Sequence, residues 1–85
     1  MQRFEYIVQA PEGIHAKPAM MLMKFANSIS AQITVSYNGR SANARNIMAL
    51  FRLGARQGAK VTFTVEGDDE SEAIESLKDF CKRNI

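Results

Sequence analysis

Residues 13–19 read Gly13-Ile14-His15-Ala16-Lys17-Pro18-Ala19, and this heptapeptide joins a loop to the first helix that the sequence predicts. An apolar stripe with helical spacing begins directly after the histidine and continues to about Ile29. Pro18 falls in the first turn, where its missing N–H costs no helical hydrogen bond. His15 is the only histidine. Because it directly precedes the predicted helix, it lies where unpaired backbone N–H groups and the helix dipole favour an anion.

Alternating apolar residues and turn signals define the elements on either side of this helix. Asn38-Gly39 is a strong hairpin signal, and Asn46 is a plausible N-cap for a short helix that Gly54 ends. The elements are expected at residues 4–8, 16–29, 32–37, 40–44, 47–53, 60–66 and 69–84. Their order is β-α-β-β-α-β-α, which predicts an α+β fold in a single domain over residues 1–85. We expect an open-faced β-sandwich, with a four-stranded antiparallel sheet and three helices on one face.

The size and composition limit the chemistry that the chain can carry. Eighty-five residues bury a modest core, so a large cofactor or deep cleft is not expected, and we predict no cofactor. Cys81 is the only cysteine, which excludes an internal disulfide and suggests a buried or half-buried thiol in a reducing compartment. No secretory signal or membrane-spanning run is apparent, so we expect a cytoplasmic protein without membrane insertion.

The net charge of +2 conceals an asymmetry along the chain. Residues 1–60 hold eight Lys and Arg against two Asp and Glu, whereas residues 61–85 hold three against seven. The surface around His15 should therefore be basic and attract phosphate or acidic partners. The basic residues are scattered, without a stacking motif, so nucleic-acid binding is not expected. One histidine and one cysteine without ligand spacing do not predict a metal site.

The motifs occur in an order that resembles the histidine-containing phosphocarrier (HPr) family of the bacterial phosphoenolpyruvate-dependent sugar phosphotransferase system. The resemblance covers essentially the whole chain. Its landmarks are Ala10-Pro11-x-Gly13-Ile14-His15-x-x-Pro18-Ala19, Asn38-Gly39, Ser41-Ala42-x-Ala44, Leu53-Gly54-x-x-Gln57-Gly58 and Glu66-Gly67-Asp68-Asp69-Glu70.

The resemblance implies that His15 accepts a phosphoryl group through Nδ1 from phosphorylated enzyme I. It would then pass the group to the A domain of a sugar-specific permease complex, as a transfer intermediate and not as an enzyme. Neutral imidazole is a competent nucleophile near neutral pH. The N–H groups of Ala16 and Lys17 are positioned to receive the phosphate at the helix start.

Two residues depart from the family pattern. Lys17 stands where the family usually has arginine, so it supplies charge without the planar fork that can hold two phosphate oxygens. We expect transfer to survive, with a slower rate or one tuned to a particular partner. Asn46 stands where many Gram-positive members carry a regulatory serine; it keeps the N-cap function but has no hydroxyl, so that phosphorylation switch should be absent.

A partner surface is expected around His15. Apolar residues beyond the core stripe could simply pack inside, but we favour an exposed collar of Met20, Ile47, Met48 and Phe51 for docking. Asn46, Lys24 and Arg52 complete the predicted partner-binding set, and some of Lys24, Arg45, Arg52 and Arg56 should steer acidic partners. Phe25 could belong to the collar, pack internally or support self-association; we expect a monomer.

Two other classes of function remain open on the sequence. The domain could be a regulatory binding module that docks on a kinase, a permease or a transcription regulator, with phosphotransfer weak or lost. A small-molecule-binding domain of similar pattern would leave the His15 motif unexplained. Retention of His15 favours the phosphocarrier.

Overall fold

A four-stranded antiparallel sheet forms one layer of the computed structural model, which describes residues 1–85. Its strands are β1 (Gln2–Ile7), β2 (Gln32–Tyr37), β3 (Arg40–Asn43) and β4 (Lys60–Glu66). They lie in the order β1-β4-β2-β3, so the first and last strands of the chain pair side by side. The hairpin predicted at Asn38-Gly39 joins β2 to β3, and both turn residues adopt the positive φ that such turns require.

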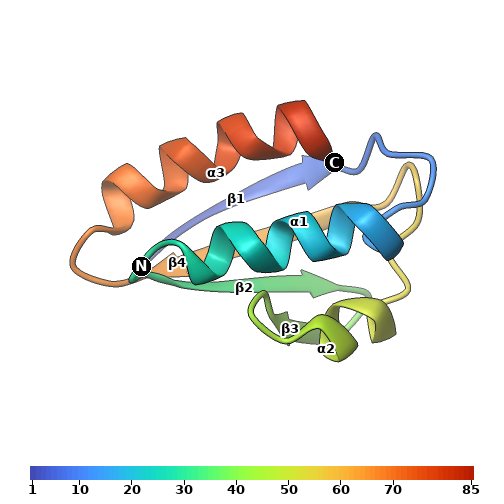
Figure 1. Ribbon diagram of the computed structural model, residues 1–85, viewed down its shortest axis with the longest axis horizontal. Coiled ribbons are helices and arrows are strands. Elements are labelled where there is room, and N and C mark those ends of the chain that lie inside the picture. Colours follow the sequence, from blue (N-terminus) through green and yellow to red (C-terminus); the bar gives the residue numbers. More distant parts are fainter.

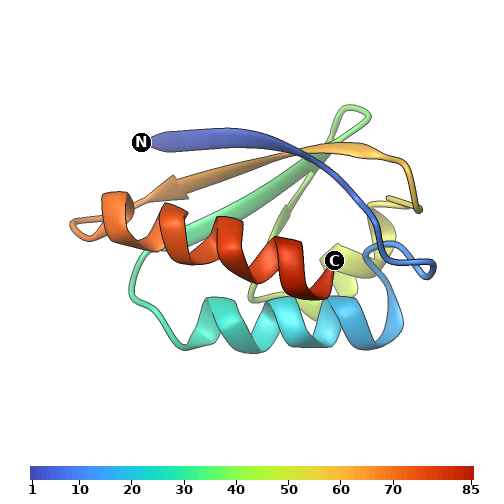
Figure 2. The ribbon, with the colours of Figure 1, turned by 90° about the horizontal axis from the view of Figure 1, so that it is seen from above.

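Three helices form the second layer. They are α1 (Ala16–Asn27), α2 (Ile47–Arg52) and α3 (Glu70–Asn84). Figure 1 shows α1 and α3 lying across the sheet with α2 beside β3, and Figure 2 shows α1 and α3 on the same side of the strands. The predicted α+β class, element order and one-sided arrangement are therefore confirmed.

Period-two alternation places one face of each strand in the core. Val61, Phe63 and Val65 of β4 are fully buried, and Phe63 stacks on its cross-strand partner Phe4 with ring centroids 5.2 Å apart. The opposite face carries polar side chains, such as Ser36 and Ser41, whose hydroxyls lie 3.1 Å apart. Because only one face is apolar, all three helices must pack on that face to bury their own stripes.

The helices contribute fully buried residues that meet the sheet in one continuous core. Leu22 of α1, Leu50 of α2 and Leu77 and Cys81 of α3 are all inaccessible to solvent. Cys81 is thus buried as the sequence indicated. No helix is long and apolar enough to cross a membrane.

The end of α1 differs from the prediction. The helix stops at Asn27 instead of about Ile29, because Ser28 closes it: its backbone N–H and its hydroxyl both donate to the carbonyl of Phe25, at 3.0 and 2.6 Å. The other boundaries shift by one or two residues: β1 runs from Gln2 to Ile7, β3 ends at Asn43, α2 ends at Arg52 and α3 begins at Glu70.

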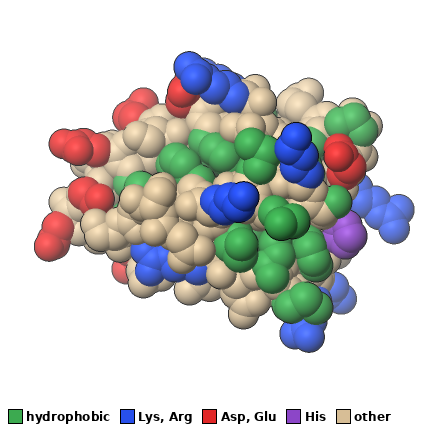
Figure 3. All heavy atoms as spheres, in the orientation of Figure 1, with side chains coloured by type: hydrophobic (Ala, Val, Ile, Leu, Met, Phe, Trp, Pro, Cys, Tyr) green, Lys and Arg blue, Asp and Glu red, His purple; other side chains and the backbone are tan.

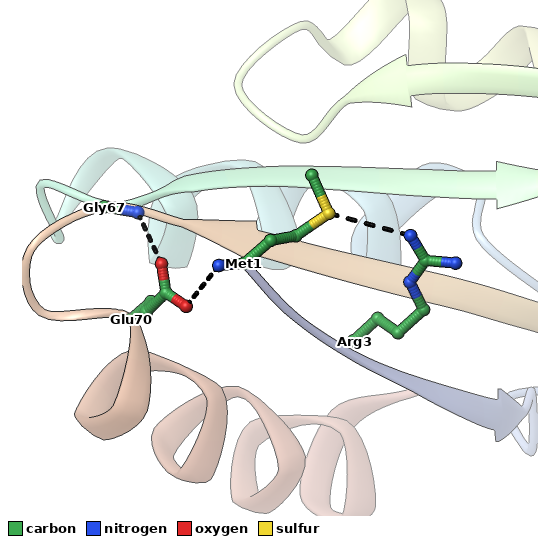
Figure 4. A network of polar contacts seen from close by, with 4 residues as sticks. All are labelled: Met1, Arg3, Gly67 and Glu70. Carbon is green, nitrogen blue, oxygen red and sulfur yellow. Dashed lines mark hydrogen bonds and ion pairs between the residues drawn. The ribbon is translucent and has the colours of Figure 1, made fainter.

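The start of α3 is held by Glu70 and not by the side chain of its N-cap residue. Asp69 makes no side-chain cap hydrogen bond, whereas the Glu70 carboxylate accepts from the Gly67 N–H at 3.3 Å and pairs with the Met1 amino group at 2.6 Å (Figure 4). The amino group, together with the Gly67 hydrogen bond, lowers the pKa of Glu70. This acidic end of the molecule lies opposite the end that carries His15 (Figure 3).

Burial of Cys81 predicts a loss of stability at high pH. Desolvation raises the pKa of this thiol to about 12, so an unfolded chain, with an ordinary thiol, releases its proton at lower pH. The folded state then binds more protons, and the free energy of unfolding should fall between about pH 9 and 12 by up to roughly 1.4 kcal/mol per pH unit for this one group. Urea unfolding of the wild type and Cys81→Ala from pH 8 to 11 measures the difference; parallel pH profiles would contradict the assignment.

Candidate functional site

The segment before His15 is fixed by unusually close backbone packing. The Ile14 N–H donates to the carbonyl of Ala55 at 2.9 Å, and the Ile14 side chain is buried. Gly13 adopts φ +72, and a Cβ there would lie 2.3 Å from the Ala55 oxygen and 2.7 Å from the Arg56 Cα. Only glycine fits this contact, which seats the loop against the segment that follows α2.

The side chain of His15, which directly follows this contact, is exposed to solvent. It is the N-cap residue of α1, with extended backbone (φ −153, ψ 163), and its side chain makes no cap hydrogen bond. No hydrogen bond or ion pair involves the imidazole, and no group of three His, Cys, Asp or Glu side chains could hold a metal ion beside it. Its ring lies against Phe51 of α2, with centroids 4.5 Å apart and planes inclined by 39°.

The first turn of α1 has an unusual backbone. Ala16 adopts φ +51, a left-handed conformation that costs an alanine roughly 1–2 kcal/mol. Pro18 is buried in the same turn and has no N–H to offer. The donors of this turn nearest to His15 are therefore the N–H groups of Ala16 and Lys17, the two that the sequence predicted to receive phosphate.

Lys17 is exposed and borders a surface hollow of about 440 Å³ between the start of α1 and the end of α3. Lys82 and Arg83 line the same hollow together with Glu12, so its charged lining side chains are three cations and one carboxylate. The loop across it is tied down, because the N–H groups of Gln9 and Ala10 donate to the carbonyl of Ile85 at 2.6 and 2.9 Å. The basic end of α3 thus adds positive charge beside Lys17, which the sequence analysis did not foresee.

The predicted apolar collar lies at the same end of the molecule. Met20 and Met48 are 47% and 53% exposed, whereas Ile47 and Phe51 are half-buried. Figure 3 shows hydrophobic side chains gathered beside the histidine, and α1 and α2 are in contact. Phe51 contacts the His15 ring directly, and the other three residues lie on α1 and α2, the two helices that meet there.

The polar members of the predicted partner-binding set are divided between structural and solvent-facing positions. Asn46 is the N-cap of α2, and its Oδ1 accepts from the Ala49 N–H at 3.1 Å. The Lys24 and Arg52 side chains are exposed and make no hydrogen bond or ion pair, although the carbonyl of Arg52 accepts from Arg40 Nη1 at 3.0 Å. These two cations are free to face a partner.

Arg45 has a structural function that the sequence did not reveal. Its guanidinium donates to carbonyls at and beyond the end of α1, with Nε 3.1 Å from the Ala26 oxygen and Nη2 2.7 Å from the Ile29 oxygen. Arg45 therefore holds the segment before α2 against the end of α1. Its guanidinium is engaged within the chain, so Lys24 and Arg52 are better candidates for attracting acidic partners. Phe25 also has an internal partner, because it stacks on Phe80 of α3 with centroids 4.9 Å apart.

Comparison with known proteins identifies the family. The family described as "PTS HPr component phosphorylation site" matches residues 2–83. The chain belongs to the PTS-HPr family. This membership supports a phosphocarrier function in the phosphotransferase system.

Solved structures agree with this assignment. HPr-C-His from Thermoanaerobacter tengcongensis is 36% identical, with a TM-score of 0.92, covering 99% of this chain and 94% of that one. Phosphocarrier protein HPr from Bacillus anthracis is 31% identical, with a TM-score of 0.87 and coverage of 94% and 95%. The Bacillus subtilis catabolite repression protein Crh, a domain-swapped dimer, is 29% identical, with a TM-score of 0.75 and coverage of 100% and 98%.

The Gly13 contact predicts a large effect of adding one methyl group. Gly13→Ala should lower the free energy of unfolding by about 2–4 kcal/mol, because the Cβ overlaps the Ala55–Arg56 backbone and alanine disfavours φ +72. Gly54→Ala is the matched control: Gly54 has φ +71 but open space around it, so its cost should be only about 1 kcal/mol. Urea unfolding measures both, and equal losses would contradict the contact.

Proposed function

We propose that His15 accepts a phosphoryl group from phosphorylated enzyme I and passes it to the A domain of a sugar-specific permease complex. The observation that carries the proposal is the exposed imidazole at the start of α1, which no hydrogen bond within the chain engages. A carrier must present one nitrogen to two different proteins in turn. An exposed side chain on a fixed backbone meets both requirements.

The chemistry needs positioning and charge stabilisation more than additional catalytic groups. A bond forms between an imidazole nitrogen and phosphorus while the bond from phosphorus to the donor breaks, and the second transfer reverses these roles. The N–H groups of Ala16 and Lys17 would donate hydrogen bonds to the phosphate oxygens, and the Lys17 ammonium would balance their charge. Both residues are thus proposed as phosphate-binding, with His15 as the acceptor.

Docking would use the apolar collar with nearby cations. Met20, Ile47, Met48 and Phe51 offer an apolar surface that can adapt to several partners, and methionine suits this because its side chain is flexible and polarisable. Lys24 and Arg52 would attract acidic partner surfaces, and this attraction should weaken with salt. Asn46 would act through the position of α2, since its side chain caps that helix.

A regulatory binding module is the second candidate, favoured by the likeness to Crh. In that function the collar would dock on a kinase, a permease or a transcription regulator, without phosphotransfer. The exposed imidazole favours the carrier instead. We propose a monomer as the working form, although Crh is a swapped dimer; the supporting feature is that one chain completes the four-stranded sheet and its core by itself.

Phosphorylation by the donor protein tests the proposed function. Incubation with phosphoenolpyruvate, Mg²⁺ and the cognate enzyme I should give an acid-labile phosphate on the wild type and none on His15→Ala. Because His15 is exposed and makes no hydrogen bond within the chain, the variant should still fold, and a cooperative thermal unfolding transition serves as the folding control. Absence of label on the wild type would exclude the carrier and favour the regulatory module.

Lys17 should limit the rate of transfer. Lys17→Arg offers a bidentate fork to the phosphate, so we expect transfer from enzyme I to accelerate by up to roughly tenfold, while Lys17→Met should slow it. Lys60→Arg is the control, because Lys60 lies on β4 and pairs with Glu5 at 3.7 Å. Rapid-quench kinetics measures the rates, and unchanged rates in both Lys17 variants would remove this residue from the phosphate site.

A further inference from the structure

The imidazole of His15 packs against the ring of Phe51. Histidines at reactive sites are usually oriented by a hydrogen bond to the ring nitrogen that does not react. Here neither nitrogen has a hydrogen-bond partner within the chain, and the aromatic contact at 4.5 Å joins the imidazole to Phe51. The side-chain orientation of His15 therefore depends on a ring face and not on a hydrogen bond.

The position of Phe51 is well fixed, because α2 is anchored at both ends. Asn46 caps the first turn, Arg40 donates to the carbonyl of Arg52, and the neighbouring Leu50 is fully buried. His15 is equally fixed at its backbone, through the Ile14 bond to Ala55. The two rings are thus placed by anchors within the same core, and their approach does not require a partner protein.

We propose that Phe51 is a positioning residue that holds the imidazole of His15 in one orientation and so selects the nitrogen that is phosphorylated. Attack on phosphorus occurs in the plane of the imidazole, along a nitrogen lone pair. A neighbouring ring packed against the imidazole restricts its rotation without covering the edge that carries the reacting nitrogen. The proposal rests on His15 as the phosphoryl acceptor and assigns to Phe51 a function separate from docking.

Chemical phosphorylation by phosphoramidate separates the two functions because it needs no partner protein. An imidazole nitrogen attacks the phosphorus, the phosphorus–nitrogen bond of phosphoramidate breaks, and the leaving group departs as ammonia with the proton that its nitrogen already carries. The products at Nδ1 and Nε2 are distinguishable by ¹⁵N and ³¹P NMR. Their ratio reports the orientation of the ring.

Phe51→Leu is the main variant, because leucine keeps an apolar side chain at this half-buried position while removing the flat ring. The ratio of the major to the minor phosphohistidine isomer should fall by roughly twofold to tenfold from the wild-type value, the range expected for loss of one aromatic pair. Phe51→Tyr should restore the wild-type ratio. Phe25→Leu is the matched control, since it removes a half-buried phenyl ring from the Phe25–Phe80 pair, about 15 Å along α1 from His15.

NMR of the unphosphorylated proteins gives an independent measurement. Imidazole protons should show contacts to the Phe51 ring and a single side-chain orientation in the wild type, and averaged couplings in Phe51→Leu. An isomer ratio unchanged in Phe51→Leu would overturn the proposal, even if transfer from enzyme I were impaired, and would leave Phe51 with docking alone. A wild type that reacts with phosphoramidate but not with enzyme I would reject the proposed function without affecting this result.

Discussion

The contact between the Gly13–Ile14 backbone and Ala55 is the constraint on which the site depends. It joins the loop before α1 to the segment after α2, through one hydrogen bond of 2.9 Å and an approach too close for any Cβ at position 13. The same contact brings His15 beside Phe51, because His15 directly follows Ile14 and Phe51 lies in α2, four residues before Ala55. This contact therefore fixes the position of the first turn of α1 relative to the end of α2.

The sheet and the helices packed on it fix the positions of the two segments that this contact joins. A sheet with one apolar face requires its helices on that face, where α1 and α2 are in contact. The N-terminal end of α1 meets the C-terminal part of α2, because His15 lies against Phe51. Arg45 strengthens this arrangement by donating to the carbonyls that follow α1. The acidic start of α3 lies at the other end of the molecule, so the surface around His15 keeps its positive charge (Figure 3).

The strands and helices could be predicted from the sequence because their burial patterns are periodic and local. The end of α1 could not be predicted, because Ser28 closes the helix through hydrogen bonds to the Phe25 carbonyl. The Ala26 carbonyl is satisfied by Arg45, which is nineteen residues away in the sequence. His15 could be identified from its motif and position alone. Its contact with Phe51 could not, because the two residues belong to different helices and only the packing of Ile14 on Ala55 brings them together. The left-handed backbone of Ala16 also has no local signal, as alanine rarely adopts it.

A single exposed imidazole, whose backbone is fixed by the Ile14–Ala55 contact, is proposed to carry the phosphoryl group next to the first amides of α1. The most direct test is the ¹H–¹⁵N NMR spectrum of the protein before and after phosphorylation by enzyme I. We expect a phosphorus-coupled nitrogen on His15, with the largest amide shifts at Ala16 and Lys17 and little change in the sheet. Phosphate on another residue, or a phosphorylated His15 that leaves those two amide signals in place, would contradict it.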